Sequence, residues 1–151
     1  MASNPTEVVG LVLGLAYRQL DAQISSSDNY DTKAAGVLGF DGAALAAILA
    51  VKDAFRGGWW IPALAIMVSI ACAFVAIQRG DYDFGPTVSS FYSKVRHSNA
   101  VEANVVLIAE MDSAIKANQG ALAAKANYFL GSLVATTAAA IASAILLWLY
   151  S

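Results

Sequence analysis

The stretch KAAGVLGFDGAALAAILAVK, Lys33 to Lys52, decides the fold because it is long and apolar enough to cross a lipid bilayer. A membrane-spanning helix needs about 20 predominantly apolar residues, with a working range of about 17 to 25. The 18 residues between the two lysines meet this requirement. One of them, Asp41, carries a carboxylate, and a carboxylate inside a membrane helix needs a partner.

The composition of the whole chain indicates a membrane protein. Of its 151 residues, 58% are hydrophobic and 13% are charged, and the mean hydropathy is +0.59. Ordinary globular chains are about 45 to 50% apolar and about 25% charged. The formal net charge of −2 leaves no basic surface, so we expect a lipid membrane as the partner and no nucleic-acid duplex.

Two further segments, residues 57–79 and 128–150, have the composition of membrane helices. The first begins next to Trp59 and Trp60, and the second ends in Trp148 and Tyr150. Such aromatic side chains anchor helices at the membrane surface. Together with residues 33–52, these segments predict three crossings.

Residues 1–30 are predicted to form a separate amphipathic helix. Asn4 as N-cap and Pro5 at the first helical position provide a start signal. The apolar part, residues 8–17, is too short to cross the membrane. The polar run at residues 25–31 is expected to end this helix before the first span.

Residues 80–127 are predicted to connect the second and third spans on the cytoplasmic side. From Asn99 onward, apolar residues recur every three, four or seven positions, which is typical of an amphipathic helix that continues into the third span. We therefore expect an all-α integral membrane protein with about three transmembrane helices, an N-terminal amphipathic helix and a helical cytoplasmic extension, forming one membrane domain over residues 1–151.

The basic residues predict the orientation of the chain. Three crossings place the N-terminal segment and the long connection on one side, with seven lysines and arginines against two in the first link. By the positive-inside rule, the N-terminus is cytoplasmic. The seven are Arg18, Lys33, Arg79, Lys94, Arg96, Lys116 and Lys125, and the two are Lys52 and Arg56.

No arrangement of residues predicts an enzyme, a metal site or a bound cofactor. His97 has no second His or Cys at metal-ligand spacing, and Cys72 lies in an apolar run where cysteine acts as a small hydrophobic residue. Sequence motifs for nucleophilic catalysis, phosphate binding and dinucleotide binding are missing. We expect a protein without catalysis.

Small residues form stripes on two of the predicted spans. Such stripes, and the glycines of apolar helices, let helix backbones approach closely. They favour helix pairing within the chain or between subunits, and we expect a homo-oligomer. The first stripe is Ala35, Gly39, Ala43 and Ala47, the second is Ala135, Ala139 and Ser143, and the glycines are Gly10, Gly14, Gly36, Gly39 and Gly42.

Asp41, with Gly39 and Ala43, is the predicted membrane or gating site. A charged aspartate at the centre of a membrane helix costs about 2.5 to 3.5 kcal/mol, so Asp41 must face protein or water, or carry a proton. Lys33 lies about 12 Å away along the helix axis, too far for direct pairing. The partner must come from another segment or subunit. Three roles fit: an element of a pore or inter-subunit contact, a packing partner of a hydroxyl or lysine, and a proton or ion relay.

The stretch YDTKAAGVLGFDGAAL, residues 30–45, resembles the opening of the Pycsar transmembrane effector family of prokaryotic defence proteins. Asp31, Lys33 and Ala34 match its D-x-K-A motif, and Asp41 stands where the family tends to have Asn. In NQGALAAKANYFLGSL, residues 118–133, Asn118 and Lys125 match the polar approach to the final span. The SLATT-type membrane effectors are the nearest alternative family.

The resemblance implies a membrane effector of bacterial anti-phage defence that is located in the cell inner membrane as a multi-pass protein. A cyclic nucleotide second messenger, cyclic UMP or cyclic CMP, made by a partner cyclase would trigger it to impair that membrane in abortive infection. The phosphate of such a nucleotide could be bound by the cytoplasmic cations Lys94, Arg96 and Lys116, or by Lys125.

Two other classes of protein explain the same spans without a ligand. A small constitutive pore, holin-like protein or transporter subunit would use Asp41 and the small-residue stripes directly. A structural membrane subunit would use them for helix packing alone.

Overall fold

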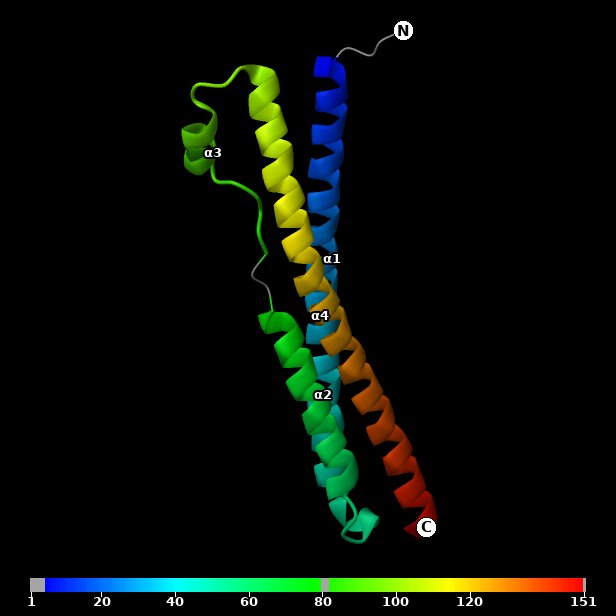
Figure 1. The fold of residues 1–151 in the computed structure, drawn as a ribbon. Coiled ribbons are helices and arrows are strands. Elements are labelled where there is room, and N and C mark those ends of the chain that lie inside the picture. Colours follow the sequence, from blue (N-terminus) through cyan, green and yellow to red (C-terminus); the bar gives the residue numbers. More distant parts are fainter. Residues whose placement is uncertain (1–4, 80–81, 151) are drawn as a thin grey trace. The chain divides into compact units, whose positions relative to one another are not determined.

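The structure is a computed structural model that describes residues 5–79 and 82–150, and within them every regular element is helical. Helices α1, α2 and α4 are each long and apolar enough to cross a membrane, which confirms the all-α class and the three candidate spans. In chain order the elements are α1 (Pro5–Ala50), the 3-10 helix η1 (Lys52–Phe55), α2 (Trp60–Gln78), α3 (Val88–Val95) and α4 (Ala100–Tyr150) (Figure 1).

The chain divides into two compact units, where the sequence predicts one domain. Unit 1 comprises Met1–Ser27 and Asp81–Leu122, and unit 2 comprises Asp28–Gly80 and Ala123–Ser151. Unit 2 therefore contains all three predicted membrane segments. The long helices α1 and α4 each contribute one part to both units.

The predicted break between an N-terminal helix and the first span is wrong. Helix α1 continues through residues 25–31 without interruption (Figure 1). No glycine or proline lies between Gly14 and Gly36 to end it. The hydroxyls in the polar run are bonded inside the helix, because Ser26 donates to the Ala22 carbonyl at 2.8 Å and Thr32 to the Asp28 carbonyl at 2.9 Å. The helix begins at Pro5, and the predicted cap Asn4 lies outside the described residues.

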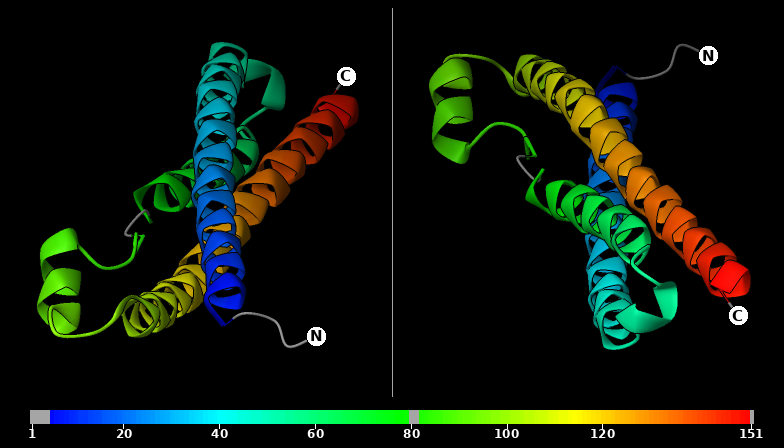
Figure 2. Two further views of the ribbon diagram at one scale, coloured as in Figure 1. Left: turned by 90° about the horizontal axis from the view of Figure 1, so that it is seen from above. Right: turned by 90° about the horizontal axis from the view of Figure 1, so that it is seen from below.

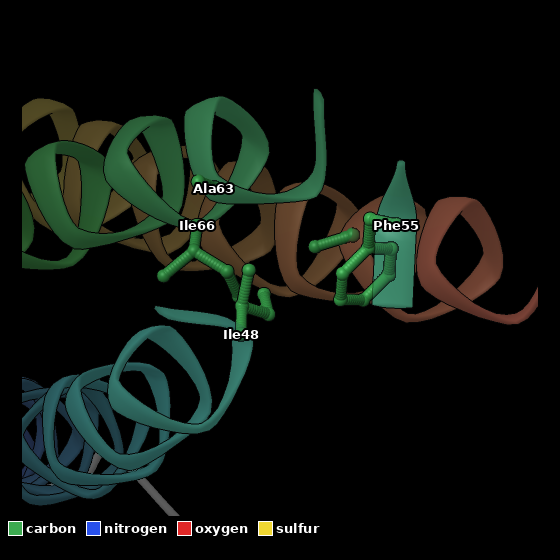
Figure 3. Packing of buried hydrophobic residues seen from close by; sticks show 5 residues of the cluster. Ile48, Phe55, Ala63 and Ile66 are labelled. Atoms are coloured by element: carbon green, nitrogen blue, oxygen red, sulfur yellow. The ribbon is translucent and has the colours of Figure 1, made fainter. Parts of the chain in front are cut away.

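In unit 2, α2 runs antiparallel to its neighbours α1 and α4 (Figure 1). Apolar side chains from all three helices meet near the link between α1 and α2 (Figure 3). Phe55 from η1 fills the end of this cluster and is 1% exposed. The members of the cluster are Ile48, Phe55, Ala63, Ile66 and Ala139.

The reversal after η1 depends on two residues with left-handed backbone conformation. Arg56 has φ 43° and Gly57 has φ 92°. The N–H of Gly58 then donates to the Phe55 carbonyl at 2.8 Å, which closes the turn. Glycine adopts such a backbone without steric cost, which suits Gly57, whereas Arg56 is a non-glycine residue in this sparsely allowed region.

In unit 1, the first part of α4 packs on the first part of α1. Leu20, Met111 and Ile115 form the buried centre, and the Gln23 amide donates to the Ile115 carbonyl at 3.1 Å. Helix α4 begins with a capping box, in which Asn99 accepts from the Glu102 N–H at 3.0 Å and Glu102 accepts from the Asn99 N–H at 3.3 Å. A short non-helical segment joins α3 to α4 (Figure 2).

The Phe55→Ala variant should lose about 3 kcal/mol of unfolding free energy, because it leaves a cavity at the end of the apolar cluster. Unfolding of the purified chain in detergent micelles measures this loss. Phe74→Ala is the matched control, since Phe74 on α2 is 52% exposed and should cost far less. Equal losses in the two variants would contradict the assignment of Phe55 to the core.

Candidate functional site

Asp41 lies in the interior of unit 2 and its side chain is completely buried. Its Oδ1 atom accepts a hydrogen bond from Thr136 Oγ1 at 2.9 Å. Asp41 belongs to α1 and Thr136 to α4, so the carboxylate finds its partner on another helix of the same chain. This confirms the prediction that the partner comes from outside the helix that carries Asp41.

The hydrogen bonds continue from Thr136 on α4 to the second span, α2. Thr136 Oγ1 lies 2.8 Å from Ser69 Oγ on α2, and Ser69 donates to the Ser132 carbonyl at 2.9 Å. Thr136 also lies 3.0 Å from the same carbonyl, with geometry suited to donation. We call Asp41, Thr136, Ser69 and Ser132 the polar core. It joins all three candidate spans.

Sequence reasoning identified only Asp41 of this polar core. Ser69, Ser132 and Thr136 are hydroxyl residues in otherwise apolar spans, and each is buried or half-buried. Interhelical hydrogen bonds from such residues are a common way of joining helices in lipid, where apolar contact alone gives little preference. The hydroxyl residues in the other two predicted spans were therefore the sequence feature from which the partners of Asp41 could have been predicted.

Near one end of the predicted spans, Asp31 and Lys125 form an ion pair. Lys125 Nζ lies 2.6 Å from Asp31 Oδ1. The side chain of Lys125 is 0% exposed and that of Asp31 is 37% exposed. Both residues belong to the motif on which the family resemblance rests, but their pairing was not predicted. The sequence did hold a clue to this pairing. Asp31 lies two residues before the predicted span that begins at 33, and Lys125 lies three residues before the one that begins at 128.

Asn118, a third motif residue, forms two hydrogen bonds with the backbone of Asp83 within unit 1. Its Oδ1 accepts from the backbone N–H of Asp83 at 2.8 Å, and its Nδ2 donates to the Asp83 carbonyl at 2.8 Å. This two-way bond attaches the connection after α2 to α4. Lys33, the fourth motif residue, is exposed and does not join the Asp31–Lys125 pair.

Gly39 and Ala43 do not join Asp41, because both are exposed on α1. The prediction that the apolar-helix glycines are close-packing sites is wrong within the chain. A Cβ added at Gly10, Gly14, Gly36, Gly39 or Gly42 would have no neighbour within 4 Å. Among the described residues, these glycines therefore lie on helix faces without a close neighbour.

Close approach occurs instead at Gly58, and Gly131 has an ordinary packing contact. A Cβ at Gly58 would lie 3.2 Å from Leu146, and one at Gly131 would lie 3.6 Å from Cys72 Sγ. Cys72 is thus a half-buried packing residue, as expected from its apolar surroundings. The second small-residue stripe also faces inward, since Ala139 is buried.

Two of the predicted phosphate contacts are paired with acids. Lys94 lies 2.5 Å from Glu110, and Lys116 lies 2.5 Å from Asp112. All four side chains are substantially exposed, so these pairs are weak. Arg96 is exposed, and Lys125 is occupied with Asp31 in unit 2.

Within the described part of the chain, no three His, Cys, Asp or Glu side chains come together to hold a metal ion. His97 is exposed, as its polar neighbourhood predicts.

The chain matches no family model, no curated protein and no solved structure.

Replacing Lys125 with Met should lower the unfolding free energy by about 2 kcal/mol, because Asp31 loses its buried partner but keeps some contact with solvent. Replacing Lys116 with Met should cost less than about 0.5 kcal/mol, because its pair with Asp112 is exposed. Denaturation in detergent micelles measures both. Equal effects of the two lysine variants would contradict a stabilising role for the Asp31–Lys125 pair.

Proposed function

We propose that the protein is a membrane effector of bacterial anti-phage defence. In this proposal it lies in the inner membrane with a cytoplasmic N-terminus. Cyclic UMP or cyclic CMP, supplied by a partner cyclase, triggers it to impair the membrane. The observation that carries the proposal is the ion pair between buried Lys125 and partly exposed Asp31, because it gives two residues of the family-like motif a shared structural role.

The polar core suggests how such an effector is kept inactive. Asp41 is completely enclosed, so no polar path past it is open within the chain as described. A ligand shifts a protein toward another arrangement only by binding that arrangement more tightly. We infer that the nucleotide favours an arrangement in which α1, α2 and α4 separate at the polar core.

Unit 1 offers cations for the nucleotide phosphate. The pairs of Lys94 with Glu110 and Lys116 with Asp112 are exposed, so a phosphate can compete for either lysine at small cost. Arg96 adds an exposed guanidinium, a group suited to bidentate contact with phosphate. These three residues remain the proposed contacts.

A structural membrane subunit is the second candidate. The Thr136–Asp41 hydrogen bond is the contact that a pure packing role for Asp41 requires. A constitutive pore has less support, because a pore lined by Asp41 needs that side chain to face water, and it is buried.

A membrane-potential dye in cells that express the protein separates these candidates. We expect depolarisation only when cyclic UMP or cyclic CMP is supplied. Depolarisation without nucleotide would indicate a constitutive pore, and none in any condition would indicate a structural subunit. Either outcome would overturn the effector proposal.

In the same assay, Asp41→Leu should abolish depolarisation while leaving membrane insertion intact, because leucine removes from α1 the polar side chain that lines the path opened when the helices separate. Asp41→Asn retains an acceptor without the charge, so its activity separates hydrogen bonding from charge. Phe40→Leu is the matched control, since Phe40 is the exposed neighbour of Asp41. Full toxicity of Asp41→Leu would remove Asp41 from the mechanism.

We further propose that the protein is a homo-oligomer that pairs through unit 1. Apolar residues on α1 and α4 line an open hollow of about 390 Å³, including Val12, Leu15 and Val105. Leu15 is 65% and Val105 is 53% exposed. Unit 1 lies outside the three predicted membrane segments, so lipid is not expected to cover this surface.

A second copy of the chain fits this hollow. Residues 8, 12 and 15 on α1, and 101, 105 and 108 on α4, follow the four-three spacing of a coiled-coil seam. Two copies in one membrane share an orientation, so their seams run parallel. Arg18 lies next to Leu15 in a neighbouring hollow and Asp112 lines the main one, which provides opposite charges for pairing across the contact.

Leu15→Glu should convert the oligomer to a monomer, because it buries a charge in the apolar contact. Size-exclusion chromatography with light scattering in detergent measures the mass. Tyr92→Glu is the control, since Tyr92 is an exposed residue of α3 that does not line the hollow. A monomeric wild type, or an unchanged Leu15→Glu oligomer, would contradict pairing through unit 1.

A further inference from the structure

The carboxylate of Asp41 is buried without a counter-charge from residues 5–79 and 82–150. Asp41 is 0% exposed, and no lysine, arginine or histidine forms an ion pair with it among the described residues. In residues 33–52, 57–79 and 128–150 the other charged residues are Lys33, Lys52 and Arg79, and all three are exposed near span ends. An isolated buried charge is very costly, so a positive species must neutralise it.

The oxygens around Asp41 have fewer hydrogens than contacts. Four contacts of 2.8 to 3.0 Å join Asp41 Oδ1, Thr136 Oγ1, Ser69 Oγ and the Ser132 carbonyl oxygen. Each hydroxyl supplies one hydrogen, and a carboxylate or carbonyl supplies none. Only two hydrogens are therefore available for four oxygen–oxygen contacts. In the contacts without a hydrogen of their own, oxygen lone pairs face one another.

A second observation concerns the other carboxylate oxygen. Asp41 Oδ2 is buried and has no hydrogen-bond partner within residues 5–79 and 82–150. An unpartnered buried polar atom costs about 1 to 3 kcal/mol, and more when it is charged. The site therefore holds an unused anionic ligand beside a group of oxygens with spare lone pairs.

We propose that the polar core binds one Na⁺ ion. Its ligands would be the Asp41 carboxylate, the hydroxyls of Thr136 and Ser69, and the Ser132 carbonyl. All are hard oxygen ligands, which favour hard cations over transition metals. One positive charge balances the single carboxylate, whereas a divalent ion would leave a net charge in the span interior. The short spacing between oxygens suits a small ion.

Na⁺ at this position joins α1, α2 and α4, because its ligands come from all three. The ion therefore stabilises the packed arrangement of the spans. This inference does not depend on the defence function, since it concerns ion binding by the chain itself. Secondary transporters also bind Na⁺ near the bilayer midplane, although they use the carbonyls of unwound helix segments, whereas Ser132 belongs to the continuous helix α4.

The test compares thermal unfolding of the purified full chain in detergent micelles in NaCl, KCl and choline chloride at equal ionic strength. At a Na⁺ concentration well above the dissociation constant, we expect the midpoint to be about 5 °C higher in NaCl. Equilibrium binding of ²²Na⁺ to the wild type should give one ion per chain and needs no variant.

Asp41→Asn and Thr136→Val should lose both the NaCl effect and ²²Na⁺ binding. Thr137→Val is the matched control, because Thr137 is exposed and donates to the Leu133 carbonyl within α4, and it should keep both. Equal midpoints in the three salts, or a NaCl effect that survives in Asp41→Asn, would overturn the proposal. Stability that depends on pH and not on Na⁺ would assign the neutralising charge to a proton and would also overturn it.

Discussion

The hydrogen bond from Thr136 to Asp41 is the contact on which the span packing depends. In the hydrocarbon interior no water is available, so a polar side chain must be satisfied by protein or by a bound ion. The Thr136–Asp41 bond meets part of that need and brings α1 and α4 together at one level. Ser69 brings α2 to the same level through Thr136 and the Ser132 carbonyl. The apolar cluster around Phe55 then closes the bundle where α1 turns into α2.

The spans were predictable because a membrane helix is a local property of the sequence. Length and apolar content are visible in residues 33–52, 57–79 and 128–150, and the last two ranges also carry tryptophan near one end. Helix α2 and the ends of α1 and α4 agree with these ranges to within about three residues. The continuity of α1 was mispredicted because short polar side chains occur both in turns and inside helices. They favour turns when they bond the backbone outside a helix, but Ser26 and Thr32 donate to carbonyls four residues earlier and leave the helix intact.

The site was less predictable, because its contacts join residues far apart in the chain. Asp41 could be recognised from its cost in lipid, but nothing local identifies Thr136 as its partner. The two long-range pairs share a nearly constant offset, 95 residues for Asp41 with Thr136 and 94 for Asp31 with Lys125. This offset reflects parallel packing of α1 on α4 within unit 2. The register is thus a tertiary property, and once one pair is known the other follows.

Polar contacts also explain why the spans adopt one arrangement. Lipid tails are as apolar as leucine, so hydrophobicity does not determine which face of a span turns inward. On α1, Asp41 points inward, while its neighbours Phe40 and Gly42 are exposed. Rotating α1 to bury Gly39 and Ala43 would take Asp41 away from Thr136 and expose a carboxylate to lipid. The hydrogen bond between Asp41 and Thr136 therefore fixes the rotation of α1 and keeps its small-residue stripe on the outer surface.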